Sequence, residues 1–196
     1  MTLSPSNYAS RYFDALDRIS RGVATTDLTQ APIAFDDAIS RFTKIVTDAK
    51  TGRGKLMFVG NGGSASIASH MAIDFFKNGG TDALAFNDPM FLTCLSNDLG
   101  YENVFSFQVE RFASKGDVLI AISSSGRSPN ILNSVAAARK RGATVVTLSG
   151  FRDDNPLRRL GDLNLYVPSG EYGYVELIHC SLCHCVLDGL MNIPTD

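Results

Sequence analysis

The sequence lacks the features that mark several large classes of proteins. Its formal net charge is −2 over 196 residues, so it has no excess of basic side chains for a broad nucleic-acid-binding surface. It shows no run with the length and apolarity of a membrane span. Its first ten residues, MTLSPSNYAS, lack the apolar segment of a signal peptide. These absences predict a cytoplasmic protein that binds neither nucleic acid nor a membrane.

Cysteine is scarce, with four residues in the chain. Three of them, Cys180, Cys183 and Cys185, form a C-x2-C-x-C pattern, but thiols in a reducing compartment seldom form disulfides. On a helix, Cys183 and Cys185 lie about 200° apart, so one metal ion cannot readily contact both. We therefore expect these cysteines to act as small buried apolar residues rather than as zinc ligands.

Strand signals are missing from the N-terminal quarter. Residues 7–21 and 31–48 both have the apolar spacing of amphipathic helices. Such helices, without a sheet of their own, usually pack on a neighbouring element or on a partner subunit. With no repeat, no low-complexity segment and no second domain boundary, the sequence predicts a single domain over residues 1–196, with a helical arm at 1–52 and an α/β core at 53–196.

From residue 55 onward, short apolar runs alternate with helical patterns. The expected strands are residues 56–59, 84–86, 118–122, 144–148 and 163–167. The expected helices are residues 65–77, 91–95, 103–112, 129–141 and 171–192. This alternation predicts an α/β fold, a three-layer sandwich around a five-stranded parallel sheet of the flavodoxin-like type, preceded by the two N-terminal helices.

One polar loop stands out in this pattern. Residues 117–128, DVLIAISSSGRS, form an expected strand followed by a serine-rich loop, and Pro129 opens the next helix. Open α/β sheets bind ligands at the carboxyl ends of their strands, and a helix N-terminus favours anions. The hydroxyls of Ser123, Ser124, Ser125 and Ser128 make phosphate a natural ligand. The alternative is a loop that only caps the helix, with Ser128 as its N-cap.

A second such loop follows the first expected strand. The sequence GNGGS at residues 60–64 supplies G-x-G-G rather than G-x-G-x-x-G, and no acidic residue ends the next strand. This departs from the dinucleotide-binding pattern. A glycine-rich turn with Ser64 at a helix start nevertheless allows a polar ligand to approach the backbone closely.

Four titratable residues lie on two otherwise apolar helices. His70 and Asp74 are four positions apart and share one helix face, while Glu176 and His184 share a face of the last helix. A single histidine in such a setting is usually a core or interface residue. The four together predict either a metal site or an acid–base pair.

The motifs GNGGSASIASH, SNDLGYEN, ISSSGRSPN and VELIHCSLCH, in this order, resemble the sugar isomerase (SIS) domain and, more narrowly, the phosphoheptose isomerases. The similarity extends over nearly the whole chain. It implies interconversion of sedoheptulose 7-phosphate and D-glycero-D-manno-heptose 7-phosphate, which leads to activated heptose for surface polysaccharide. It also implies a homotetramer with active sites at subunit interfaces.

The resemblance assigns substrate contacts to three of these motifs. The serine loop would bind the phosphate through Ser123, Ser125 and Ser128, with Ser124 between them and Ser64 close by. The glycine turn would contact the sugar through Asn61, Gly62 and Gly63. The SNDLGYEN motif would contact it through Asn97 and Asp98. The implied ligand is a phosphorylated sugar.

The resemblance also places His70, Asp74, Glu176 and His184 on positions that bind zinc in some members, with Asp74 and His184 doubling as catalytic base and acid. Two of these residues depart from the family pattern, because Asp74 stands where glutamate is usual and Glu176 where glutamine is usual. In addition, Gly173 stands where the family pattern has a further acidic residue. Either Asp74 or Glu176 is therefore the candidate base, and a related phosphosugar remains possible as substrate.

A different class of function also fits the resemblance. Some proteins with this domain bind a phosphosugar, or a protein partner such as a replication initiator, without catalysis. The two histidines and two carboxylates at His70, Asp74, Glu176 and His184 favour an enzyme.

Overall fold

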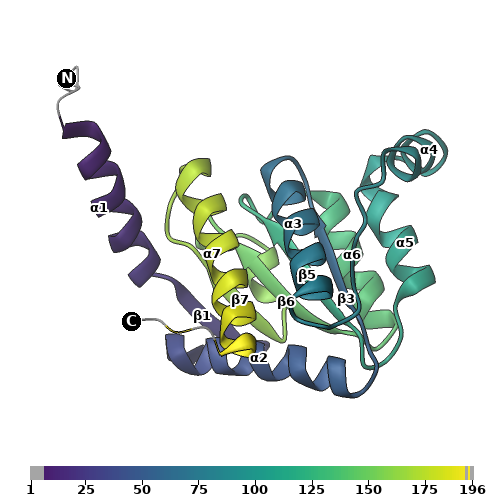
Figure 1. Ribbon diagram of the computed structural model, residues 1–196. Coiled ribbons are helices and arrows are strands. Elements are labelled where there is room, and N and C mark those ends of the chain that lie inside the picture. Colours follow the sequence, from purple (N-terminus) through teal and green to yellow (C-terminus); the bar gives the residue numbers. More distant parts are fainter. Residues whose placement is uncertain (1–6, 193, 195–196) are drawn as a thin grey trace.

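The computed structural model describes residues 7–192 and 194 and shows an α/β fold (Figure 1). Its central sheet has the strand order β2-β1-β7-β6-β5-β3-β4. The strands are β1 (Ala24–Asp27), β2 (Pro32–Ile33), β3 (Leu56–Gly60), β4 (Ala83–Ala85), β5 (Val118–Ser123), β6 (Thr144–Ser149) and β7 (Leu163–Tyr166). The strands β3, β4, β5, β6 and β7 pair with one another only in parallel, which confirms the predicted parallel sheet.

The sheet has seven strands rather than the five predicted. β1 lies between the two predicted N-terminal helices, β2 lies at the start of the second one, and β1 pairs antiparallel with both β2 and β7. Their sequences, ATTD and PI, are too short and polar to give a strand pattern. Hydrogen bonding of β1 to β7, and of β2 to β1, makes them strands instead. The hydroxyl of Thr25 in β1 also donates to the carbonyl of Ile33 in β2 at 2.6 Å. The N-terminal arm is therefore not purely helical.

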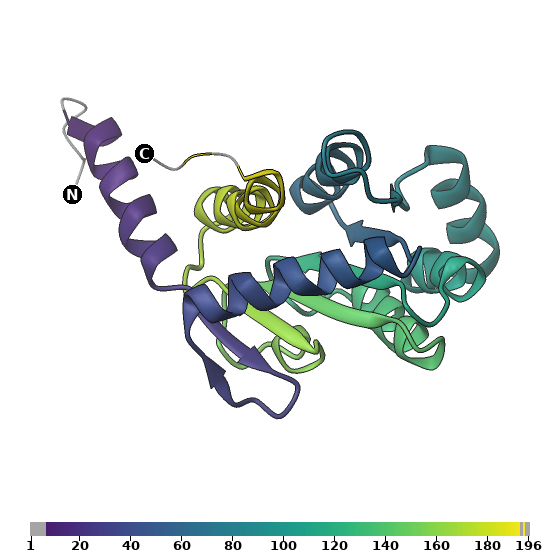
Figure 2. The same cartoon turned by 60° about the horizontal axis from the view of Figure 1, so that its bottom comes forward.

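Two layers of helices cover the sheet, as the three-layer prediction requires. The helices are α1 (Tyr8–Arg21), α2 (Phe35–Thr51), α3 (Gly63–Lys77), α4 (Pro89–Leu99), α5 (Val104–Phe112), α6 (Pro129–Lys140) and α7 (Tyr172–Met191). Alternate residues of β3 face opposite layers: Leu56 and Phe58 pack with α2, α3 and α7, whereas Met57 and Val59 pack with α4, α5 and α6. Figure 2 shows the layer of α2, α3 and α7 from the side of α2.

The first helix stands apart from these layers. α1 extends away from the sheet (Figure 1) and contains no buried residue. Its aromatic side chains Tyr8 and Phe13 are 58% and 66% exposed. The ring of Tyr12 stacks on that of Tyr174 in α7, with 4.8 Å between the ring centroids. In a single chain, α1 thus leaves an apolar face uncovered.

The last helix, α7, is a core element. By length and composition alone it is apolar enough to cross a membrane, which corrects the expectation that no segment meets that test. Such a composition is also typical of a buried helix in a globular protein. Here Val175, Ile178, Leu182 and Val186 are buried in the same core as residues of α2 and α3.

Asp117 connects the amino-terminal ends of the neighbouring strands β3 and β5. Its carboxylate accepts hydrogen bonds from the backbone N–H of Lys55 at 2.9 Å, from the Lys55 ammonium at 2.6 Å, and from the N–H of Ser114 at 2.7 Å. The Asp117 side chain is only 4% exposed. All of its partners would therefore lose a buried charged acceptor together if the carboxylate were removed.

We predict that Asp117→Ala lowers the free energy of unfolding by about 2–4 kcal/mol, because it leaves a partly buried ammonium and two backbone amides without their charged acceptor. Chemical denaturation followed by circular dichroism measures this change. Asp48→Ala is the control: Asp48 pairs with Lys44 at the surface, and we expect little change there. Equal effects of the two substitutions would contradict the structural role of Asp117.

Candidate functional site

A cavity of about 240 Å³ lies at the carboxyl ends of β3 and β5. The glycine turn after β3, the serine loop after β5 and the beginning of α7 enclose it. Its lining residues are Asn61, Gly62, Gly63, Ser64, Ser123, Ser124, Ser125, Ser128, Tyr172 and Glu176. The structure thus brings together nine of the residues singled out in the sequence and adds Tyr172. Nothing in the sequence indicated that Tyr172 lines a cavity, because a tyrosine at the start of a predicted helix is not by itself a binding signal.

The serine loop presents several hydroxyl groups to this cavity. The Oγ of Ser124 is buried and has no hydrogen-bond partner among the described residues. Ser128 occupies the N-cap position of α6, but its side chain caps no N–H of the helix as far as residues 7–192 show. The oxygens of Ser123 and Ser125 accept from the N–H groups of Gly126 and Arg127, at 3.2 and 3.3 Å. Their hydroxyl protons are therefore available to a ligand that accepts hydrogen bonds.

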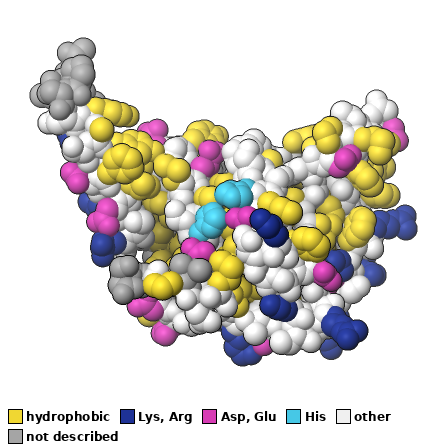
Figure 3. All heavy atoms as spheres, viewed as in Figure 1, with side chains coloured by type: hydrophobic (Ala, Val, Ile, Leu, Met, Phe, Trp, Pro, Cys, Tyr) yellow, Lys and Arg dark blue, Asp and Glu magenta, His cyan; other side chains and the backbone are white. Residues whose placement is uncertain are grey.

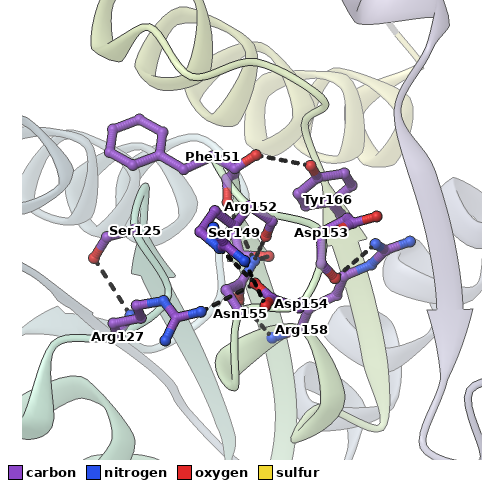
Figure 4. A network of polar contacts seen from close by, with 11 residues as sticks. Ser125, Arg127, Ser149, Phe151, Arg152, Asp153, Asp154, Asn155, Arg158 and Tyr166 are labelled. Atoms are coloured by element: carbon purple, nitrogen blue, oxygen red, sulfur yellow. Dashed lines mark hydrogen bonds and ion pairs between the residues drawn. The ribbon is translucent and has the colours of Figure 1, made fainter.

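The segment that follows β6 braces the serine loop (Figure 4). Asn155 is completely buried, and its side-chain amide donates to the carbonyls of Gly150 and Arg152 at 3.1 and 2.8 Å. Asp154 accepts from the guanidinium groups of Arg127 and Arg152 at 3.0 and 2.9 Å. The Arg152 side chain, and then Arg127, hold the pKa of the Asp154 carboxyl well below its usual range. Arg127 thus connects the serine loop to this segment, and the backbone N–H groups of Gly150 and Leu157 donate to the loop carbonyls of Ser124 and Gly126 at 3.0 and 3.1 Å.

The glycine turn meets α7 at Glu176. Gly62 has a φ of +56°, which favours glycine at this position. A side chain at Gly63 would collide with the carboxylate of Glu176. The lack of a side chain therefore allows the carboxylate to lie against the N-terminus of α3, where a helix stabilises negative charge. The structure confirms neither a catalytic nor a binding role for Glu176, but it places this carboxylate in the cavity wall.

Asn130, which the sequence analysis did not single out, holds Asn61 in place. The two side-chain amides exchange a pair of hydrogen bonds, each 2.9 Å long. Tyr101 also donates to Asn61, at 3.0 Å. Asn130 is only 2% exposed, and this burial could not be read from its place in a polar motif. The loops after β3 and β5 are thus linked by side chains as well as by the sheet.

Several side chains of the kinds that bind metal ions lie beside this cavity, between α3 and α7. Candidate ligand atoms of His70, Cys180 and His184 all lie within 4.8 Å of one another, and the two imidazole rings are 5.2 Å apart between centroids. The carboxylate of Asp74 lies 3.2 Å from Nε2 of His70. Figure 3 shows histidine and acidic side chains together on this face.

This arrangement corrects the interpretation of the cysteines. Cys183 is buried, as expected, and burial raises the pKa of its thiol. Cys185 is exposed and Cys180 is partly buried, so neither is simply a core residue. Burial raises the pKa of the Cys180 thiol, and the charge of Asp74 adds to this effect. Helical spacing excluded a shared ion for Cys183 and Cys185, but it could not show that Cys180 faces His70 on another helix.

Asn97 and Asp98 lie away from the cavity in the single chain. The SNDLGYEN segment, which lies mostly between the predicted helices at 91–95 and 103–112, is largely helical: its first four residues form the last turn of α4, and Tyr101–Asn103 form a short 3-10 helix. Both side chains are exposed, and the Asn97 amide donates to the Asp98 carboxylate at 2.8 Å. The structure of one chain does not bring these two residues to the predicted sugar site.

Comparisons with known proteins agree with this geometry. The family model of the SIS domain matches residues 12–150. A phosphoheptose isomerase from Bradyrhizobium sp. (strain BTAi1 / ATCC BAA-1182) is 38% identical over 185 residues, which cover 88% of this chain and 91% of the relative. The structure of phosphoheptose isomerase GmhA from Neisseria gonorrhoeae is 28% identical, with a TM-score of 0.84, and the match covers 97% of this chain and all of that one. A phosphoheptose isomerase from Francisella tularensis gives a TM-score of 0.83 at 25% identity, with coverage of 97% and 100%.

His179 contacts the end of β6 and gives the fold a pH dependence. It is completely buried, and its Nε2 lies 3.1 Å from the carbonyl oxygen of Ser149. Burial lowers its pKa from 6.5 to about 4. The unfolded chain therefore takes up a proton below pH 6.5 that the folded chain resists until about pH 4. The stability contributed by neutral His179 is complete above that window and is lost as the pH falls through it.

We predict that the free energy of unfolding falls by up to about 1.4 kcal/mol per pH unit from this residue as the pH decreases from 6.5 to 4. His179→Asn, which keeps a hydrogen-bond donor but does not titrate in this range, should lose this part of the slope. Denaturant titrations at several pH values compare the two proteins. Parallel pH profiles would show that His179 is not the titrating group.

Proposed function

This chain belongs to the phosphoheptose isomerases of the SIS domain family, and on this premise we propose that it interconverts sedoheptulose 7-phosphate and D-glycero-D-manno-heptose 7-phosphate. Both sugars carry a phosphate at one end and a reacting carbonyl at the other. The reaction moves a proton between two neighbouring carbons and the oxygens attached to them. The site must therefore combine an anion-binding end with an acid–base end.

The observation that supports this proposal is the continuity of these two ends along α7. Glu176 lines the cavity formed by the serine loop. Cys180 and His184 follow it at intervals of four residues on the same helix, and His184 lies beside His70 of α3. A phosphosugar with its phosphate on the serines would thus extend towards a carboxylate and two imidazoles.

The phosphate end is proposed to be the serine loop. The phosphate oxygens would accept hydrogen bonds from Ser123, Ser124, Ser125 and Ser128, and the N-terminus of α6 would add its positive dipole. The buried, unpartnered hydroxyl of Ser124 supports this role, because such a group is costly unless a ligand satisfies it. On the other wall, Asn61 and the backbone of Gly62, Gly63 and Ser64 would contact the sugar.

The proton chemistry is proposed to come from α3 and α7. A carboxylate, Asp74 or Glu176, removes the proton from the carbon beside the carbonyl. His184 donates and accepts protons at the sugar oxygens, and the resulting enediolate is reprotonated at the neighbouring carbon. Glu176 lies in the cavity wall, whereas Asp74 contacts His70. In the single chain, Glu176 is therefore the nearer of the two candidate bases.

Zinc is a proposed cofactor of this end of the site. The chemistry of the donor set fits it, because imidazoles from His70 and His184 lie together with the carboxylate of Asp74 beside them. The sequence resemblance adds Glu176 as a fourth ligand. When bound, the ion would polarise the substrate carbonyl.

A cytoplasmic location also belongs to this proposal, because the phosphosugar substrates are soluble metabolites.

We also propose assembly into a homotetramer. The uncovered apolar face of α1, with Tyr8 and Phe13, is suited to a contact between subunits. Such assembly would also offer a place for Asn97 and Asp98, which a single chain leaves outside the cavity. Their proposed contact with the sugar then depends on the arrangement of subunits.

The reaction is tested by incubating the purified protein with sedoheptulose 7-phosphate and, separately, with arabinose, fructose and glucosamine phosphates, with and without chelator. We expect turnover of the heptose phosphate. Replacing the true base, by Asp74→Asn or Glu176→Gln, should lower kcat by about 10²–10⁴-fold. Normal turnover in both variants would show that neither residue is the base. Absence of turnover with every sugar would favour a protein that binds phosphosugars without catalysis.

Ser125→Ala tests the phosphate end separately. Loss of one hydrogen bond to a charged group costs about 1.5–3 kcal/mol, so we expect KM for the phosphosugar to rise about 10–150-fold. Inhibition by inorganic phosphate should weaken in parallel. Ser106→Ala is the control, because Ser106 bonds to the backbone carbonyl of Asn103 outside the cavity. A variant with unchanged KM and unchanged phosphate inhibition would remove Ser125 from the phosphate site.

A further inference from the structure

We propose that the thiol of Cys180 is a metal ligand in this chain and forms, with the imidazoles of His70 and His184, a thiolate-containing site for zinc. The inference extends the proposed function, on which the presence of a metal rests, but it concerns a ligand that the resemblance does not supply. The thiol proton is released to solvent when the ion binds, so that the thiolate sulfur forms the metal bond.

The geometry is close to that of a bound ion. Ligand atoms of the three residues lie within 4.8 Å of one another. Zinc bonds of about 2.0–2.3 Å in a tetrahedral arrangement separate neighbouring ligand atoms by roughly 3.5 Å. A contraction of about 1 Å is within the reach of side-chain rotation. Cys180 and His184 lie four residues apart on α7, so they project from the same face of that helix.

The neighbouring carboxylate strengthens the assignment. Asp74 contacts Nε2 of His70 at 3.2 Å, and a metal-bound imidazole commonly holds a carboxylate in this way. Asp74 would then orient His70 while Cys180 provides the third bond to the ion. Three protein ligands leave one tetrahedral position open, as in catalytic zinc sites. The partial exposure of Cys180 and His184 keeps that position accessible to substrate.

The sulfur ligand predicts which ions the site prefers. Thiolates favour zinc, cobalt and cadmium over magnesium and manganese, which prefer oxygen ligands. A site of His70, Asp74, Glu176 and His184 has only nitrogen and oxygen donors. The two ligand sets therefore differ in a property that can be measured without any enzymatic assay.

The experiment treats the purified full-length protein with chelator, adds Co²⁺ and records the absorption spectrum. We expect a near-ultraviolet band of thiolate-to-cobalt charge transfer in the wild type. Cys180→Ser and Cys180→Ala should lose this band, and their affinity for Cd²⁺ should fall by at least about 10-fold, since even an outer-shell change costs this much. Cys185→Ser, which changes an exposed cysteine of the same helix, should keep both properties.

Three outcomes would overturn the proposal: visible cobalt bands without charge transfer in the wild type, a charge-transfer band that survives in both Cys180 variants, or no binding of cobalt. Circular dichroism of each variant shows whether it is folded. The isomerase assay is run in parallel on the wild type. Turnover without a charge-transfer band would leave the proposed isomerase intact and remove Cys180 from the metal site. A charge-transfer band without turnover would keep Cys180 as a metal ligand and contradict the proposed isomerase activity.

Discussion

The parallel register between β3 and β5 is the constraint on which the candidate site depends. Leu56 pairs with Val118 at one end of these strands, and Gly60 pairs with Ile122 at the other. The contacts of Asp117 with Lys55 hold the first end. The glycine turn and the serine loop therefore leave the sheet at the same edge and face each other across one cavity. The paired amides of Asn61 and Asn130 connect the two loops just beyond the last strand residues.

The two ends of the site are held by different physical means. The proposed phosphate end consists of loops that are held by hydrogen bonds, next to a segment with buried Asn155 and the Asp154 ion pairs. The proposed acid–base end consists of side chains on α3 and α7, whose positions follow from helix packing in the apolar core. A change in core packing would shift His70 relative to His184 while leaving the serine loop in place. The two proposed ends of the site thus depend on separable parts of the fold.

Much of the fold could be predicted from the sequence because its signals are local. The five parallel strands are apolar runs bounded by turn residues, and the serine loop follows the strand pattern directly. β1 could not be predicted, because the polar residues Ala24–Asp27 become a strand only by pairing with β7. The same holds for the site: spacing places Cys180 and His184 on one face of α7, but only packing shows that this face meets His70. Residues 96–99 were left outside the predicted helices for the same reason, although they complete α4.

The division of the site bears on how the enzyme selects its substrate. In the proposed site, the serine loop would recognise the phosphate group, which every phosphosugar has, so it would provide affinity without discriminating between sugars. Discrimination would arise where the carbon chain and its hydroxyls lie, near Glu176, Asp74 and the two imidazoles. Asp74 and Glu176 are also the positions at which this chain differs from the pattern of the phosphoheptose isomerases that its motifs resemble. In the proposed site, the carboxylate of Glu176 and the thiol of Cys180 would set the charge and the donor atoms around the reacting carbons, apart from the serine loop. The physical basis proposed for any preference of this chain among phosphosugars therefore lies between α3 and α7.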